Sequence, residues 1–222
     1  MVENILDYKW NKLLRRAGLF LFVPFVDIVF VAGSMAMETA KENSDFDVLV
    51  GARSGRIFTA RAFCILFFGL LGWRKKRTDN GDAAKDKFCF SHFVTPDKYS
   101  LSGPHNQYWD ELYSSLVPIY GDIKDIERFY VANSTWMKEE RKYQKDIRHL
   151  YSKPGFIKIF LEKILSGKPG DLFEKWVKNI QIKKIQKSLE TEKQYKPRII
   201  FNDLELEFHP DTKRIEEYIK KI

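Results

Sequence analysis

The chain has 222 residues, a formal net charge of +8 and 44% hydrophobic residues, a composition that fits a packed globular protein and excludes a disordered tail. Its two cysteines, Cys64 and Cys89, both lie in apolar runs, which excludes a disulfide scaffold or a cysteine-rich zinc site and favours a cytoplasmic location. The N-terminal segment carries its acids first and its basic pair last, the reverse of a secretory signal. Two apolar stretches, residues 19–37 and 57–73, are interrupted by charges, proline or glycine, so we expect buried elements and no membrane as a partner.

The first half of the chain predicts strands that alternate with helices. Apolar residues recur at helical spacing over residues 3–16, which indicates an amphipathic helix. The run DIVFVA is β-branched and aromatic, as in a buried strand, and the turn residues Asn43-Ser44 separate it from a second such run. The resulting order is a strand at 27–32, a short helix at 34–41, a strand at 45–51, a long helix at 56–76 and a strand at 88–95.

The second half predicts mainly helices, near 106–116, 123–153 and 170–189, followed by a hairpin at 198–210. Residues 1–130 contain 17 basic and 16 acidic residues, which leaves 21 and 14 for the other 92 residues. The excess positive charge is therefore C-terminal, where it indicates either solvated helix faces or a surface for RNA or another polyanion. We predict an α/β (α+β) protein, with a small mixed sheet flanked by helices in residues 1–125 and a basic, mainly helical region with a terminal β-hairpin in residues 126–222.

One motif carries chemistry. Gly33 ends a predicted strand, where the lack of a Cβ lets the backbone approach a phosphate, and Ser34 adds a hydroxyl at the following helix start. Asp45 and Asp47 are two residues apart on a strand, so their carboxylates leave the same face. Oxygen ligands of this kind favour Mg²⁺ or Mn²⁺. The sequence thus predicts a phosphate cradle beside a metal site.

The segment VAGSMAMETAKENSDFDVLV resembles the signature of the polymerase β-type nucleotidyltransferase superfamily, in which an apolar strand, Gly-Ser, a spacer of about ten residues and Asp-x-Asp follow one another. The resemblance covers about residues 28–51 and implies the nucleotidyltransferase fold. It also implies that Gly33 and Ser34 bind a nucleoside triphosphate, with ATP favoured, and that Asp45 and Asp47 bind Mg²⁺. Ser44, in the turn ENSD that also resembles family members, is expected at the nucleotide as well.

Active members of that superfamily usually add a third carboxylate from a later strand, and here that strand, FCFSHFVT, has none. Ser91 and His92 are expected near the vacant position, where His92 is a general base, a structural histidine or a nucleotide contact. Asp86 is a second candidate for the missing carboxylate, or else a solvated charge. Arg61, a charge within an apolar helix, is expected either to contact phosphate or to pair with an aspartate.

The leading hypothesis is a Mg²⁺-dependent enzyme that transfers a nucleoside monophosphate, AMP favoured, to a hydroxyl of RNA, protein or a small molecule. The alternative is a weakly active or inactive nucleotide-binding module with a regulatory or RNA-binding role. A purely structural basic protein would make the motif coincidental. The sequence leaves the nucleobase, the acceptor and the oligomeric state open.

Overall fold

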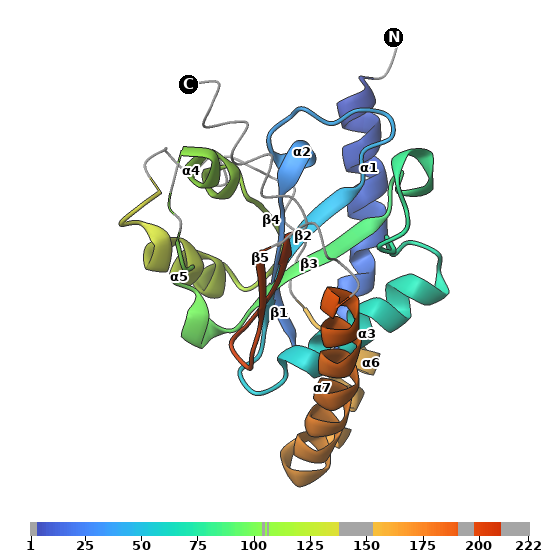
Figure 1. Cartoon of the computed structure of the whole chain (residues 1–222), viewed down its shortest axis with the longest axis vertical. Coiled ribbons are helices and arrows are strands. Elements are labelled where there is room, and N and C mark those ends of the chain that lie inside the picture. The colour runs from blue at the N-terminus through green and yellow to red at the C-terminus, as the bar shows by residue number, and fades with distance from the viewer. Residues whose placement is uncertain (1–3, 104, 106, 138–152, 191–197, 210–222) are drawn as a thin grey trace.

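The computed structural model describes residues 4–103, 105, 107–137, 153–190 and 198–209 (Figure 1). In the first half of the chain, every predicted strand and helix is present, but both helices that follow strands are shorter than predicted. The short helix ends at residue 36, and the long helix ends at residue 70, just before Gly72 adopts φ +69°. The elements are α1 (Ile5–Ala17), β1 (Val26–Val31), α2 (Gly33–Ala36), β2 (Phe46–Ala52), α3 (Ile57–Leu70) and β3 (Phe88–Val94). Short 3₁₀ turns occupy Gly18–Phe22, Gly81–Ala83 and Pro96–Lys98.

The second half contains two elements that the sequence analysis does not predict, the strand β4 and the helix α6. The helix expected over 123–153 ends at residue 133 as α5, and residues 138–152 of that prediction lie outside the described residues. The predicted terminal hairpin is confirmed. The elements are α4 (Gln107–Ser114), β4 (Val117–Gly121), α5 (Ile123–Asn133), α6 (Phe156–Ile164), α7 (Gly167–Glu190), β5 (Arg198–Phe201) and β6 (Glu205–His209).

The six described strands form one mixed sheet in the order β4-β1-β2-β3-β6-β5. Only the β2–β3 pair among them is parallel, with Phe46 beside Phe88, and the other neighbours are antiparallel. The hairpin is not a separate unit, because β6 pairs directly with β3 through Phe93 and Leu206. The predicted small mixed sheet flanked by helices is therefore confirmed, and it draws strands from both predicted regions, 1–125 and 126–222.

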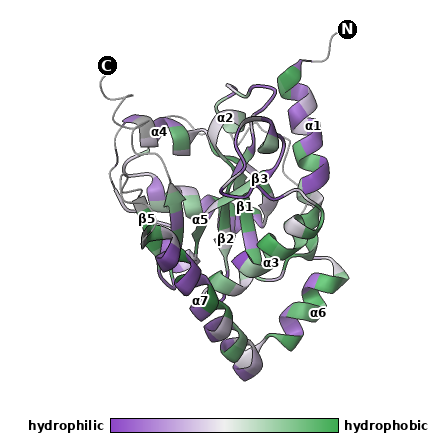
Figure 2. Cartoon of the chain, turned by 45° about the vertical axis from the view of Figure 1, so that its right-hand side comes forward, coloured by the Kyte–Doolittle hydropathy of each residue, from purple (hydrophilic) through white to green (hydrophobic). Residues whose placement is uncertain are grey.

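Helices cover both faces of the sheet (Figures 1 and 2). One core contains Leu13 of α1 and Phe58 and Phe68 of α3 against the sheet. The other contains Tyr113 of α4 and Phe129 of α5. Side chains of β2 alternate between the two, since Phe46, Val48 and Val50 enter the first core and Leu49 enters the second. Asp47 therefore shares the face of Leu49, the face covered by α4 and α5.

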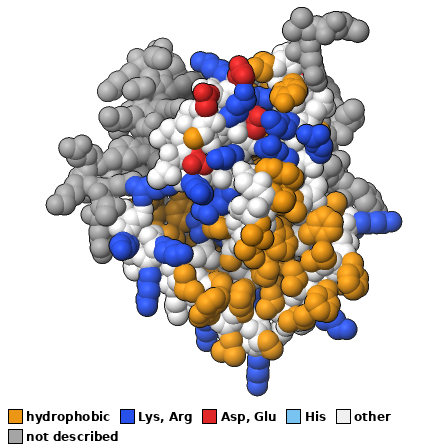
Figure 3. All heavy atoms as spheres, turned by 90° about the vertical axis from the view of Figure 1, so that its right-hand side faces the viewer, with side chains coloured by type: hydrophobic (Ala, Val, Ile, Leu, Met, Phe, Trp, Pro, Cys, Tyr) orange, Lys and Arg blue, Asp and Glu red, His pale blue; other side chains and the backbone are white. Residues whose placement is uncertain are grey.

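No helix in the described part of the chain is both long and apolar enough to cross a membrane. On the face shown in Figure 3, exposed apolar side chains gather in one broad area, and Lys and Arg are dense beside it.

Candidate metal and nucleotide site

The two aspartates of the motif meet at the start of β2. Asp45 directly precedes the strand and Asp47 is its second residue, so both carboxylates emerge on the same face. Their oxygens and the Cys89 thiol lie within 4.8 Å of one another, and all three side chains are half-buried. The convergence of the two carboxylates that the sequence predicts is thus present in the structure.

The backbone of Gly33 lies against the Asp47 carboxylate of this cluster. It follows the end of β1, where the Ala32 amide donates a 2.9 Å hydrogen bond to the Asp47 carbonyl. Gly33 itself adopts φ +60°, and a Cβ at this position would lie 2.4 Å from Asp47 Oδ2. Only glycine fits both the conformation and the space, so the Gly33-Ser34 turn adjoins the carboxylates as predicted.

Lys75 is a member of the site that the sequence analysis missed. Its Nζ lies 2.7 Å from Asp45 Oδ2, and its amide donates a 2.8 Å hydrogen bond to the Phe88 carbonyl, which fixes the residue beside β3. Burial opposes the charge on Lys75, but the hydrogen bond and attraction of Asp45 outweigh it and raise the pKa of the ammonium. Asp45 is thus paired with the Lys75 ammonium group.

Cys89 is the side chain of β3 that lies beside the aspartates. It pairs in register with Asp47 across the parallel β2–β3 ladder, and an irregularity in β3 then shifts His92 to a position opposite Leu49. Of the two residues expected near the aspartates, Ser91 hydrogen-bonds with the Cys89 side chain and so lies beside the cluster, whereas the irregularity in β3 displaces His92. Burial, and then the charges of Asp47 and Asp45, raise the pKa of the Cys89 thiol.

His92 belongs to a separate buried cluster further along the same face of the sheet. Its Nε2 lies 3.2 Å from Glu205 Oε1, and its Nδ1 lies 3.2 Å from the hydroxyl of Tyr113. Glu207, opposite His92 on β6, completes the cluster. These contacts support the structural interpretation of His92 and not the general base.

Ser44 and Asp86 hold the turn before β2 and do not point to a ligand. Ser44 Oγ accepts a 2.9 Å hydrogen bond from the Lys41 amide, and the Ser44 carbonyl accepts one of 2.8 Å from Lys9 Nζ. Asp86, expected on a solvated loop, is instead 3% exposed and paired with Lys9 and Lys12 of α1. It therefore anchors a helix and supplies no third carboxylate.

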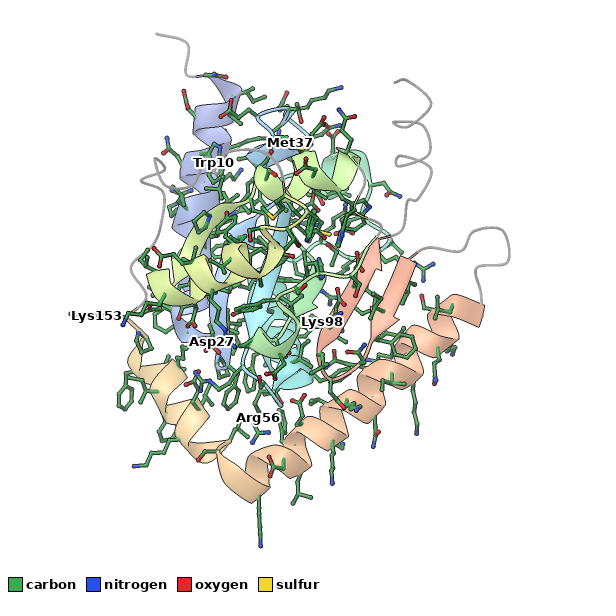
Figure 4. All side chains as sticks on the ribbon, turned by 90° about the vertical axis from the view of Figure 1, so that its left-hand side faces the viewer. Trp10, Asp27, Met37, Arg56, Lys98 and Lys153 are labelled. Atoms are coloured by element: carbon green, nitrogen blue, oxygen red, sulfur yellow. The ribbon has the colours of Figure 1, made fainter. Side chains whose placement is uncertain are left out.

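Arg61, considered as a phosphate ligand, and Arg56, which follows the Asp-x-Asp strand, lie elsewhere. Arg61 is packed on the opposite face of the sheet from Asp47, where it donates to Gln181 of α7 at 2.6 Å and lies over the Phe208 ring. Burial lowers its pKa to about 10. Arg56 pairs with Asp171 at 2.7 Å, near the junction of α6 and α7 (Figure 4). Neither expectation for Arg61, phosphate or an aspartate partner, fits these contacts.

The remaining features of the surface do not compete with the cluster as a nucleotide site. The aromatic side chains Trp109 and Tyr113 are buried in the second core. Two surface cavities have volumes of about 450 and 540 Å³. The first is lined by Arg53 to Arg56 and the second by Lys41 to Asn43, and neither lining includes Asp45 or Asp47. Comparisons of the chain with protein-family models, with curated proteins and with solved structures find no match.

Proposed function

We propose that the chain is a Mg²⁺-dependent nucleotidyltransferase that transfers a nucleoside monophosphate from a nucleoside triphosphate to a hydroxyl acceptor and releases pyrophosphate. The observation that supports this most directly is the contact of the Gly33 backbone with the Asp47 carboxylate, beside Asp45. It joins the two parts that the chemistry needs, a place where backbone can approach phosphate and a pair of hard oxygen ligands.

The donor set fits magnesium. Asp45 and Asp47 would hold the ion through carboxylate oxygens, the ligands that Mg²⁺ prefers. When bound, such an ion neutralises charge on the phosphates and orients the reacting oxygens. Gly33 and Ser34 would bind the phosphate chain, and the Lys75 ammonium stands close enough to Asp45 to turn from the carboxylate to an incoming phosphate.

A second candidate, binding of a metal-nucleotide with little or no transfer, is favoured by Cys89. Described strand β3 carries no carboxylate, and the side chain in register with Asp47 is a thiol. The other carboxylates on this face of the sheet, Glu205 and Glu207, are placed with His92 instead. In such a protein the bound nucleotide would act as a regulatory ligand and not as a substrate.

A labelling assay separates the two. The protein is incubated with each α-³²P-labelled nucleoside triphosphate and Mg²⁺, with cellular RNA and protein as acceptors. The enzyme transfers label, and Asp45→Asn and Asp47→Asn each reduce transfer by at least about 100-fold, because loss of metal binding removes several kcal/mol of transition-state stabilisation. Asp82→Asn, an exposed carboxylate on the loop before β3, is the matched control and retains transfer.

Binding of labelled nucleotide without transfer would assign the chain to the second candidate. Neither binding nor transfer, with folded protein, would contradict both.

A further inference from the structure

Helix α6 packs with polar side chains against the protein and exposes its apolar side. Lys158, 4% exposed, donates to the Val26 carbonyl, and Glu162 accepts a 2.7 Å hydrogen bond from the Phe25 amide, so the polar side of the helix faces the protein. The apolar side faces outward, with Phe156 80% exposed and Phe160 53% exposed. Because specific hydrogen bonds fix the polar side, the exposure of the apolar side follows from how the helix is docked.

Helix α7 repeats the arrangement. Glu174 and Gln181 are buried and bind the first turn of α3, since Glu174 accepts from the Phe58 and Thr59 amides and Gln181 donates to the Phe58 carbonyl. The opposite side carries an apolar row four residues apart, formed by Leu172 (69% exposed), Trp176 (59%) and Ile180 (36%). Two successive helices thus place polar side chains against the protein, on α7 beside the buried Val177, and expose apolar rows.

These rows form part of one apolar face, which we define as the exposed apolar side chains of α3, α6 and α7. Aromatic contacts join α3 to α7, with ring centroids of Phe63 and Phe173 6.1 Å apart and those of Phe173 and Trp176 5.7 Å apart. On α3, Leu70 is 77% exposed. Figure 3 shows the apolar side chains gathered in a single broad area on this side of the molecule. Areas of this kind mark interaction sites in soluble proteins.

The exposed charge around the apolar face is mainly positive. Among the described residues from 153 to 190, the exposed lysines are Lys153, Lys163, Lys168, Lys175, Lys183, Lys184 and Lys187. The acids on the same helices are largely engaged by the protein itself, since Glu162 and Glu174 bind backbone amides and Asp171 pairs with Arg56. In Figure 3 blue side chains surround the apolar area and red ones lie away from it.

We propose that the apolar face, with its lysine rim, docks on the surface of an anionic lipid membrane. Aromatic and aliphatic side chains on one side of a helix, with lysines beside them, are the requirements for binding in the plane of a bilayer interface. The lysines supply attraction to acidic headgroups, and Phe156, Phe160 and Trp176 enter the interfacial layer. Such binding needs no spanning helix, and it revises the expectation from sequence that no membrane is a partner.

The alternatives fit the observations less well. A second copy of the chain would bring two lysine rims together, which is unfavourable for a symmetric contact. A nucleic acid would pair with the lysines but would leave the apolar row in water, because backbone phosphates give it nothing to bury against.

The test is sedimentation of the full chain with vesicles of phosphatidylcholine alone or with 30% phosphatidylglycerol. We expect binding to the anionic vesicles in 0.1 M NaCl, at least about tenfold weaker binding to neutral vesicles or in 0.5 M NaCl, and a blue shift of tryptophan emission as Trp176 leaves water. The triple variant Phe156→Gln, Phe160→Gln, Trp176→Gln should lose at least about tenfold in vesicle binding while it keeps the circular dichroism and thermal unfolding of the parent.

The matched control is Ile123→Gln, Val131→Gln on α5, where the two side chains are 51% and 64% exposed. It should bind vesicles like the parent. Absence of sedimentation with anionic vesicles, or equal binding by the triple variant, would overturn the proposal. A concentration-dependent dimer in light scattering that the triple variant abolishes would also overturn it and would assign the face to a second copy.

Discussion

Asp86 lies 2.7 Å from Lys9 Nζ and 2.5 Å from Lys12 Nζ, and it joins α1 to the turn before β3. Burial alone would raise the pKa of this carboxyl, but the hydrogen bonds and charges of the two lysines outweigh it and lower the pKa. The folded pKa is therefore below the unfolded value of about 4. The resulting stabilisation is present above that pH and is lost as the pH falls through the folded pKa.

Asp86→Asn should lower the free energy of unfolding by about 3 kcal/mol at pH 7, because it leaves Lys9, 1% exposed, without its counter-charge. Urea unfolding at pH 7 and below pH 3 measures the effect. The difference between the two proteins should shrink at the lower pH, where Asp86 is protonated in the parent. A difference that is independent of pH would show that the charge of Asp86 is not what stabilises α1.

The identity of the residue at position 89 should affect the rate of the proposed nucleotidyl transfer. Cys89→Asp places a carboxylate in register with Asp47, on the strand from which the resemblance implies a third acidic group, and it should raise the transfer rate in Mg²⁺ above that of the parent. Cys89→Ala is the control and should leave the rate unchanged. A fall in rate with both variants would mean that the thiol itself contributes to the site.

Between elements, the first turn of α3 depends on a side chain from α7. Arg56 at the N-terminus of α3 makes no capping hydrogen bond with its side chain. Glu174 takes that role from a distance in sequence, accepting from the Phe58 amide at 2.9 Å and from the Thr59 amide at 2.8 Å. A carboxylate at a helix N-terminus also interacts favourably with the helix dipole.

Glu174→Ala should therefore lower the free energy of unfolding by about 3 kcal/mol, since two buried amides lose their acceptor. Glu174→Gln keeps one acceptor oxygen and should cost about half as much. Chemical denaturation of the three proteins gives the values. Equal stability of Glu174→Ala and the parent would show that α7 does not support α3.

The same elements show what the sequence can and cannot predict. The contact between Gly33 and Asp47 was predictable, because a strand, a tight turn and period-2 alternation are all local features. The roles of Lys75 and Cys89 were not, because they depend on which strand pairs with β2 and in which register. Tertiary packing sets that register, and the irregularity in β3 moved His92 away from the predicted place.

At the scale of the whole molecule, one sheet joins the two regions that the sequence separated. The predicted hairpin was recognisable from its alternation, but its pairing with β3 is a contact over more than 100 residues that no local pattern specifies. The exposed side of α6 was equally hidden, because its apolar composition alone favours a buried helix. Contacts between distant segments, and not local propensity, therefore set the surroundings of the site and the apolar face.

The central claim is that Gly33, Asp45 and Asp47 form one metal and nucleotide site. Titration calorimetry of the full chain with ATP, with and without Mg²⁺, tests it most directly in the parent, in Gly33→Ala and in the Asp82→Asn control. We predict binding that requires Mg²⁺ and is at least about tenfold weaker in Gly33→Ala, whose Cβ would stand 2.4 Å from Asp47 Oδ2. Binding without Mg²⁺ dependence, or equal binding by folded Gly33→Ala, would contradict the claim.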